Sequence, residues 1–289
     1  MLERLRDLIL ERNDRVYAAA VITEAGQEQI SCTPMGKCSN NYSVTKIFIN
    51  TLVGQFIERG VWSMESRLTE LLKEQLVFPY DSRWDAVTVR DALGHRMGLT
   101  AGIFDIDRDD PASYGTKDYL RFIFSCPPTE PPGTNFFYTD AAHYLLSRAI
   151  TAAAGQAADE WIRRNIEVPL EFYPSSWQRC PFGYTVGATG SFMQAADVVK
   201  LAWVYLNDGE FYGKRLLSSK WVRQAERERF DFYPMRVGDF IGKSGIYGQF
   251  MGYSRKKKCA VAWHACEPDS RRERALRQAI LTWLWEEMP

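Results

Sequence analysis

The sequence has no excess of either charge and no apolar run long enough to cross a membrane. Its 289 residues include 36 basic and 36 acidic side chains, so the formal net charge is zero. Nucleic-acid-binding proteins normally carry a basic excess that meets the phosphates, so this balance argues against that class. A membrane-spanning helix needs about 18 consecutive apolar residues, and the sequence contains no such run. Nucleic-acid and membrane partners are therefore not expected.

Neither disulfide-paired cysteines nor a secretory leader are expected from the sequence pattern. Charged residues interrupt the first ten positions too often for the apolar core of a signal peptide. The six cysteines are scattered, without a C-x-x-C pair or a metal-ligand spacing. In a chain without an export signal, free thiols are the simplest expectation. The sequence therefore predicts a cytoplasmic protein.

Strand patterns lie near both ends of the sequence, and helical patterns fill the middle. The elements expected near the ends are a helix over 2–12, strands over 16–22 and 29–32 separated at Gly26, strands over 249–254 and 259–265 joined by a basic turn at 255–258, and a closing helix over 274–285. Because the two strand pairs come from opposite ends, one sheet built from both termini is expected.

The resulting prediction is an α/β (α+β) protein with an antiparallel sheet flanked by terminal helices. No repeat, low-complexity tract or flexible linker divides the sequence. We therefore expect a single domain over 1–289, with its α/β part at about 1–42 and 226–289. A mostly helical region is expected to be inserted at about 43–225.

The first candidate catalytic motif is Ser43-Val44-Thr45-Lys46, at the start of an apolar helical pattern that ends near Gly60. Residues three apart on a helix share a face, so the hydroxyl and the amine are expected on the same side. Taken alone, a serine at a helix start is more simply explained as an N-cap.

The lysine at position 46 argues against the interpretation of Ser43 as a simple N-cap. A capping box has Glu or Gln at this position, and a cation opposes the positive end of the helix dipole. Burial of a lysine lowers the pKa of its amine, which could then act as a base near neutrality. A second S-x-x-K sequence begins at Ser254 and ends at Lys257. It is set aside because we expect it in a charged, solvated turn.

The second candidate motif is Tyr138-Thr139-Asp140, after a turn-rich stretch. A helical pattern follows from Ala141 to about Ala154 and stops at Gly155, so Asp140 is expected to be the N-cap of that helix. A lone tyrosine here could simply be a packed aromatic side chain.

The third candidate motif is Lys243-Ser244-Gly245, just before the last strand pair. It could be no more than an exposed turn. If it is functional, Gly245 lets a substrate approach a strand edge closely, Ser244 offers a hydroxyl and Lys243 supplies a fixed positive charge.

In this order the three motifs resemble those of serine β-lactamases and penicillin-binding proteins, closest to the class C enzymes and related esterases. The similarity extends over nearly the whole chain, because Val87–Leu99 is similar to a family segment around a histidine. Gly187–Asp197 likewise resembles a Gly-rich loop that precedes a helix in the family. The resemblance implies a β-lactamase/transpeptidase-like fold.

The resemblance also implies a mechanism. Ser43 attacks a carbonyl and forms an acyl-enzyme, which water then releases. Lys46 and Tyr138 share the removal and return of the serine proton. Lys243 holds Tyr138 partly ionised or binds a substrate carboxylate.

The remaining implied roles concern the substrate. The backbone N–H groups of Ser43 and Ile246 form the oxyanion hole. Asp140, Ser244 and Gly245 are expected at the substrate, and neither a metal nor another cofactor is needed. Asp140 departs from the family, which has Asn there, and an ionised carboxylate near Lys46 favours the charged amine. Efficient β-lactam hydrolysis is therefore in doubt, while ester or small-amide hydrolysis is not.

Three functions remain open at the level of the sequence. The first is a serine hydrolase for a small-molecule ester, small amide, D-amino peptide or β-lactam. The second is an acyltransferase on the same fold, since an acyl-enzyme can pass its acyl group to an amine or alcohol. The third is a non-catalytic ligand-binding or sensor protein in which Asp140 has quenched turnover. The natural substrate and the oligomeric state do not follow from the residues.

Overall fold

The computed structural model describes residues 2–33 and 38–288. The chain forms two compact units, and each has its own continuous set of contacts. Unit 1 comprises 1–44, 167–176 and 191–289, and unit 2 comprises 45–166 and 177–190. The first boundary thus falls inside the Ser43–Lys46 motif. The segment 191–225, expected in the helical region, lies in unit 1.

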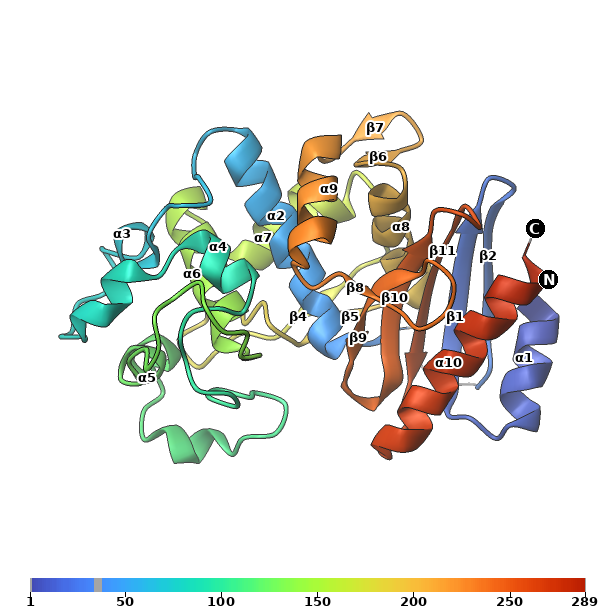
Figure 1. The fold of residues 1–289 in the computed structure, drawn as a ribbon, viewed down its shortest axis with the longest axis horizontal. Coiled ribbons are helices and arrows are strands. Elements are labelled where there is room, and N and C mark those ends of the chain that lie inside the picture. Colours follow the sequence, from blue (N-terminus) through green and yellow to red (C-terminus); the bar gives the residue numbers. More distant parts are fainter. Residues whose placement is uncertain (1, 34–37, 289) are drawn as a thin grey trace. The chain divides into compact units, whose positions relative to one another are not determined.

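Unit 1 is built on an antiparallel sheet that contains both ends of the chain (Figure 1). Its strands, in spatial order, are β2 (Gly26–Ser31), β1 (Val16–Thr23), β11 (Cys259–Ala265), β10 (Gln249–Ser254), β9 (Ile241–Gly245) and β8 (Tyr233–Pro234). The central pairing joins β1 to β11, with Ala20 opposite Ala262 and Val21 opposite Val261. The expected hairpins at both ends and their union in one sheet are confirmed.

Helices cover both faces of this sheet. Those of unit 1 are α1 (Leu2–Glu11), α8 (Ala195–Leu206), α9 (Ser219–Glu228) and α10 (Ser270–Glu287). Successive side chains of a strand point to opposite faces. One face of β1 packs with α1 and α10, and α8 contacts β1, β10 and β11. Small paired strands complete this unit or mark its passages to unit 2: β3 (Ser39–Asn40), β4 (Ser176–Trp177), β5 (Ser191–Met193), β6 (Glu210–Phe211) and β7 (Lys214–Arg215).

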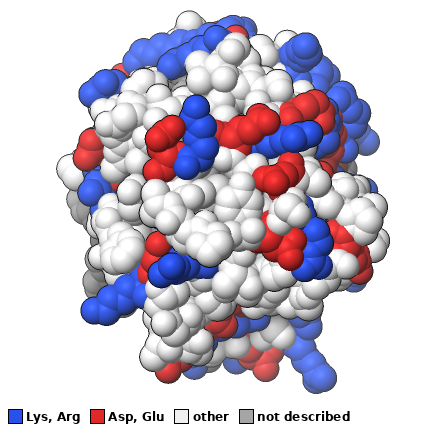
Figure 2. All heavy atoms as spheres, turned by 90° about the vertical axis from the view of Figure 1, so that its left-hand side faces the viewer, with Lys and Arg blue, Asp and Glu red and all other residues white. Residues whose placement is uncertain are grey.

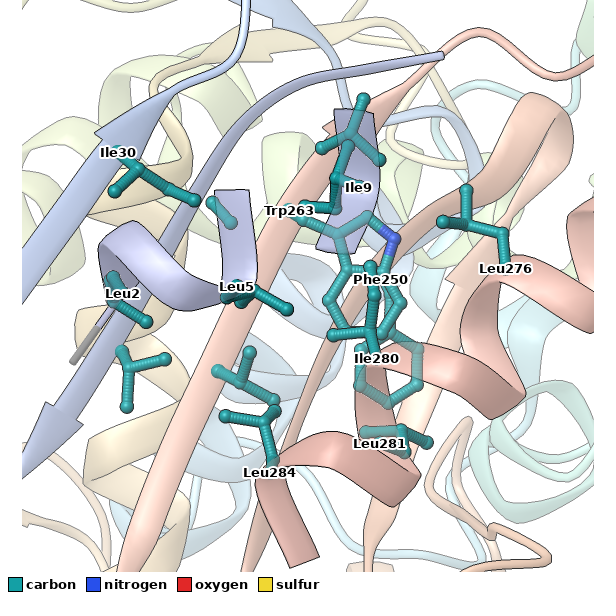
Figure 3. Close-up of a cluster of buried hydrophobic side chains, with 14 of the residues drawn as sticks. Leu2, Leu5, Ile9, Ile30, Phe250, Trp263, Leu276, Ile280, Leu281 and Leu284 are labelled. Carbon is teal, nitrogen blue, oxygen red and sulfur yellow. The ribbon is translucent and has the colours of Figure 1, made fainter. Parts of the chain in front are cut away.

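The core of unit 1 lies between the sheet and the two terminal helices (Figure 3). Leu5 and Ile9 of α1 and Leu284 of α10 lie at helical spacing and are buried against the strands. Phe250 and Trp263 stack across β10 and β11 with ring centroids 4.4 Å apart. Burying each such side chain stabilises the fold by about 2 kcal/mol. This core therefore holds β10 and β11 in place beside β9.

Unit 2 is helical. Its elements are α2 (Lys46–Glu58), α3 (Leu68–Leu71), η2 (Ser82–Ala86), α4 (Val89–Leu93), η3 (Pro111–Tyr114), α5 (Tyr119–Phe124), α6 (Ala141–Ala154) and α7 (Ala158–Ile162). The π-helical turn η4 (Arg163–Glu167) leads out of it. Helix α6 is its centre, because α2, α3, α4 and α7 all contact it. The predicted bounds of α6 are confirmed, and Gly155 ends the helix in the left-handed conformation.

One predicted helix end is wrong. The sequence predicts a short helix capped by Thr88, with Asp91 in its first turn, and ended by Gly98. Thr88 does cap α4, and with Asp91 it forms a capping box. The helix then ends at Leu93 with Gly94 as its C-cap, well before the expected Gly98. Gly98 instead serves a close backbone approach, because an added Cβ would lie 2.1 Å from the carbonyl oxygen of Glu130.

Among the described residues, no helix is both long and apolar enough to span a bilayer. Basic and acidic side chains lie side by side on the face drawn in Figure 2, in keeping with the zero formal net charge. The six cysteines are free thiols, as expected.

Candidate active site

Lys46 is the most enclosed of the predicted site residues. It is the first residue of α2 and has no solvent exposure. Its Nζ donates to Asp140 Oδ1 at 2.7 Å and to the carbonyl oxygen of Ala188 at 2.8 Å. The same Nζ lies 4.9 Å from the centre of the Tyr138 ring. Unit 2 thus brings Lys46, Tyr138 and Asp140 together around one buried ammonium group.

Ser43 lies in the short 3₁₀ helix η1 (Tyr42–Thr45), which continues directly into α2. It is half-buried. The cap position of α2 is Thr45, whose side chain makes no capping bond, so Ser43 is not the N-cap of this helix. Ser43 and Lys46 therefore stand three residues apart in one continuous helical segment, as the catalytic interpretation requires.

The predicted capping role of Asp140 is wrong. Asp140 occupies the cap position of α6 but makes no side-chain capping bond there. The hydroxyl of Thr139 accepts from the N–H of Ala141 instead, at 3.1 Å. The Asp140 carboxylate accepts from Lys46 and, at 3.1 Å, from the N–H of Ile106. The carboxylate of Asp140 therefore pairs with the Lys46 ammonium and does not cap α6.

A second carboxylate lies in the same part of unit 2. Asp107 accepts from the hydroxyl of Thr189 at 2.8 Å. Burial raises the pKa of Asp107 to about 6, with the charge of Asp140 adding to the rise. Both protonation states of this carboxyl are therefore populated near pH 6.

Tyr138 lies just before α6 and is half-buried. The imidazole of His95 packs on its ring, with centroids 4.5 Å apart and the planes tilted by 30°. His95 is itself 1% exposed and belongs to the turn after α4. The tyrosine is thus held between a buried imidazole and the Lys46 ammonium. The sequence did not predict this contact between His95 and Tyr138.

The Lys243-Ser244-Gly245 motif is part of strand β9, not a turn. Lys243 is 4% exposed, and its ammonium forms an ion pair with Asp231, which is wholly buried. Ser244 accepts a hydrogen bond from Arg277 of α10, at 2.7 Å. Both polar side chains of the motif therefore have partners within unit 1.

Position 245 requires glycine because the backbone of the segment before Ser43 passes close to it. An added Cβ would lie 2.7 Å from the carbonyl oxygen of Asn41 and 3.1 Å from Cβ of Tyr42. Any larger residue would push the end of β9 away from the segment that precedes Ser43. Unit 1 thus brings the K-S-G strand and the candidate nucleophile segment side by side.

Backbone strain marks both of these neighbouring segments. Tyr42, before Ser43, has φ 46°, and Tyr247, after Ile246, has φ 65°. Bulky residues rarely adopt left-handed backbone, which costs about 1 kcal/mol or more per residue. The two tyrosine rings pack edge to face with centroids 5.2 Å apart. Each of the two predicted oxyanion-hole amides therefore lies next to a strained residue.

Asn41 anchors this region from beneath. Its side chain donates to Ser191 at 3.0 Å, and its Oδ1 lies 2.7 Å from Nε2 of His264. Burial lowers the pKa of His264 to about 4, so the imidazole is neutral near neutrality. With the Asn41 amide turned to Ser191, Nε2 of His264 is the donor to Asn41. His264 is packed in β11, as predicted, and it braces the residue two positions before Ser43.

The second S-x-x-K sequence lies in the turn between β10 and β11. Ser254 is buried there and donates to Asp239, while its oxygen accepts from the N–H of Lys257. Lys257 Nζ reaches the carbonyl oxygen of Met288. The expectation that this serine is solvated is wrong, but its hydroxyl is committed to a structural bond.

The predicted site residues thus form two sets. Lys46, Tyr138 and Asp140 meet in unit 2; Ser43, Lys243, Ser244, Gly245 and Ile246 belong to unit 1. The chain itself joins the sets, because Ser43 and Lys46 share one helical segment. Sequence reasoning missed Asp231, Asn41 and His95. Their partners lie in other segments, so no local spacing could have found them.

Comparison with known proteins finds the same family by sequence and the same fold by structure. The family model described as Beta-lactamase matches residues 7–281. Penicillin-binding protein 4 of Amycolatopsis lactamdurans is 26% identical over 210 residues, which is 61% of this chain. The match takes in 53% of that relative, so the chain corresponds to about half of it.

Two solved structures share the fold over almost the entire chain. One is described as a candidate 6-aminohexanoate-dimer hydrolase from Bacillus anthracis, with TM-score 0.79, 16% identity and coverage of 99% of this chain and 83% of that one. The other is EstCE1, described as a hydrolase with promiscuous acyltransferase activity, with TM-score 0.72, 14% identity and 97% coverage of both chains.

Proposed function

Because the chain belongs to the beta-lactamase family, we propose that it is a serine hydrolase that acts through an acyl-enzyme on Ser43. The observation that carries the proposal is the buried Lys46 ammonium, in contact with Tyr138 and one helical turn after Ser43. Burying a lysine is costly unless its charge has a use or a partner. Here the lysine has both a carboxylate partner and a phenol beside it.

In the proposed reaction the Ser43 hydroxyl attacks the carbonyl carbon of the substrate. Its proton passes to the pair formed by Lys46 and Tyr138 and then to the leaving group. An ion pair with Asp140 favours the ammonium form of Lys46. Acceptance of the serine proton therefore requires the neutral amine of Lys46, which becomes populated as pH rises, or the phenolate of Tyr138. A water molecule then attacks the acyl-enzyme and releases the acid product.

The N–H groups of Ser43 and Ile246 are proposed to stabilise the tetrahedral oxyanion. The close approach at Gly245 and the strained neighbours Tyr42 and Tyr247 support this assignment, since they hold the two segments together in unit 1. Donors fixed before the reaction need no reorganisation as charge develops, and removing one typically costs about 3 kcal/mol of barrier.

The proposed substrates are esters and small amides. Proteins of the same fold are described as a 6-aminohexanoate-dimer hydrolase and as a hydrolase with promiscuous acyltransferase activity, and their folds match nearly the whole of this chain. The Asp140 carboxylate occupies the position where the family has an amide, and it is bonded to Lys46. It cannot donate the hydrogen bond that an amide side chain at this position would offer, so efficient β-lactam turnover is not proposed.

The test is covalent labelling of the nucleophile. A fluorophosphonate probe should label the wild type and Ser254→Ala, and Ser43→Ala should lose the label. Ser254→Ala is the matched control, because it removes the serine of the other S-x-x-K sequence. Equal labelling of wild type and Ser43→Ala would refute the proposal.

Acyl transfer is a second candidate, favoured by the described activity of EstCE1. An acyl-enzyme on Ser43 could be attacked by an amine or an alcohol in place of water. Adding benzylamine to an ester assay separates the two: an N-benzyl amide among the products shows transfer, and the free acid alone shows hydrolysis.

A non-catalytic ligand-binding protein is the third candidate. The two buried ion pairs favour it, since each motif lysine already has a carboxylate partner. Such a protein would form a stable acyl adduct on Ser43 without turnover. Intact mass measured over hours after mixing with an activated ester distinguishes a persistent adduct from one that disappears.

A further inference from the structure

The charge of Lys243 is matched by a second buried residue for which the catalytic scheme has no use. Lys243 is the middle residue of β9, and its ammonium pairs with Asp231 from the loop between α9 and β8. Asp231 has no solvent exposure and Lys243 has 4%. Because the two opposite charges are in contact, the pair carries no net charge toward a ligand, and its burial leaves the pairing weakly screened by salt.

Asp231 is fixed in place by its neighbours. Its φ is 60°, and its N–H donates to the carbonyl oxygen of Arg229 at 2.8 Å. Phe232, the next residue, is wholly buried and packs on Tyr205 with ring centroids 4.4 Å apart. The following strand β8 is hydrogen-bonded to β9. The carboxylate cannot turn away from Lys243 without unpacking this loop.

A cavity of about 690 Å³ in unit 1 is lined by residues of β8, β9 and α10, among them Lys243, Ser244 and three arginines: Arg236, Arg274 and Arg277. No aspartate or glutamate is among its lining residues. Arg277 is bonded to Ser244 and to Glu273. The ammonium of Lys243 is therefore paired with Asp231, while Arg277 is bonded to Ser244 of the same motif.

We propose that Asp231 is a specificity-determining residue that neutralises Lys243 and restricts the site to acyl substrates without a carboxylate on the acyl group. The inference rests on the proposed function. A substrate carboxylate beside Lys243 would gain attraction from the ammonium and lose a similar amount to the Asp231 carboxylate. An uncharged acyl chain meets no such opposition. Removing the charge of Asp231 would leave the positive charge of Lys243 without this compensation.

The test compares two esters of matched acyl length, p-nitrophenyl butyrate and the p-nitrophenyl monoester of succinic acid. The wild type should prefer the butyrate. In Asp231→Asn the ratio of kcat/KM for the succinate ester to that for the butyrate should rise at least about tenfold, which corresponds to about 1.4 kcal/mol. Asn can still accept from Lys243, so the variant keeps a bonded partner for the ammonium.

Glu171→Gln is the control, because it removes one exposed negative charge of unit 1 and should leave the ratio within about twofold of wild type. A folded Asp231→Asn protein with an unchanged ratio overturns the inference. So does a wild type that already prefers the succinate ester tenfold, since the cavity arginines would then recognise the carboxylate.

A wild-type measurement decides the case in which Asp231→Asn does not fold. Phenylboronic acid and 3-carboxyphenylboronic acid should inhibit the wild type with inhibition constants within about threefold of each other. Tenfold tighter binding of the carboxylated inhibitor overturns the inference. An enzyme inactive on both esters and unlabelled by the fluorophosphonate overturns the proposed function as well. An active, Ser43-dependent enzyme that fails only these tests overturns the inference alone.

Discussion

The lysine–aspartate pairs formed by the lysines of the S-x-x-K and K-S-G motifs differ in how they are built. Lys46 of unit 2 is paired with a residue 94 positions away and also binds the carbonyl oxygen of Ala188. Lys243 of unit 1 is paired with a residue 12 positions away, across a short loop and a strand. The first lysine gathers three separate segments around its ammonium. The second stays within one supersecondary element.

This difference bears on what each lysine can do. Lys46 begins a helix, where a cation opposes the dipole, and it has an aromatic phenol within 5 Å. An arrangement that costs stability and places a proton acceptor beside an amine is typical of catalytic sites. Lys243 sits in a strand with no such penalty, and its charge is cancelled locally. Lys46 is therefore expected to carry the chemistry and Lys243 to shape the substrate site.

The largest effect is expected from removing each lysine. Lys46→Met should lower kcat/KM for p-nitrophenyl butyrate about 10³-fold, because a general acid–base group is lost. Lys243→Met should lower it only about tenfold, because the charge removed is already neutralised. Both changes leave a buried aspartate without its cation, so each should lower the free energy of unfolding by about 3 kcal/mol.

Activity must be normalised to folded protein, measured by near-UV circular dichroism at low temperature. Equal losses of activity in the two variants would erase the distinction between the pairs. A larger loss in Lys243→Met than in Lys46→Met would reverse it.

The next effect concerns the partner in unit 2. Asp140→Asn keeps an acceptor for Lys46 but removes the charge that favours its ammonium form. The rising limb of the profile of kcat against pH should move to lower pH by about one unit, and turnover near pH 7 should rise about tenfold. The control is Asp231→Asn, which should leave the position of that limb unchanged. A limb that stays in place in Asp140→Asn means that Lys46 is not the titrating base.

The elements that the sequence predicted well are those whose pattern is local. Strands β10 and β11 and helix α6 have the predicted bounds, since alternating or helical apolar spacing and Gly155 define them within a few turns of chain. The end of α4 was misplaced because Gly98 is needed for a contact with Glu130, which is distant in sequence.

The candidate site shows the same limit. The three motifs could be found by residue type and order, yet their partners could not. Asp140 looked like a cap because it precedes a helix, and only tertiary packing brings Lys46 to it. Asp231 belongs to no recognisable sequence motif. It meets Lys243 only because the loop that carries it folds back against β9.

The two units also differ in how their stability should depend on pH. Burial lowers the pKa of a histidine in unit 1 and raises the pKa of an aspartate in unit 2. Burial lowers the pKa of His264, in unit 1, to about 4 from 6.5. The unfolded state then binds more protons between these values, so stability is complete above about pH 6.5 and falls as pH drops toward 4. Between about pH 7 and about pH 4.5 this group should remove about 2 kcal/mol.

The variant that isolates this effect is His264→Gln, which keeps a donor for Asn41 without a titrating ring. Its free energy of unfolding in urea should fall by about 2 kcal/mol less than that of wild type over the same pH interval. A parallel fall in both proteins would mean that other groups control the acid sensitivity of unit 1.

The smallest effect is expected in unit 2, at Asp107. Burial raises the pKa of Asp107 from 3.8 to about 6. The folded state then binds more protons between these values, so stability falls as pH rises through this window, opposite to the effect of His264. Asp107 keeps some solvent exposure, so the penalty above about pH 6 should be only about 1 kcal/mol.

Asp107→Asn should remove that penalty, because the amide oxygen can still accept from Thr189. Its free energy of unfolding should exceed that of wild type by about 1 kcal/mol near pH 7.5 and match it near pH 4. Glu74→Gln, an exposed charge change in the same unit, should show no such pH-dependent gain. A gain of equal size at both pH values would point to relief of charge crowding without titration. The opposite pH responses of the two units would then rest on His264 alone.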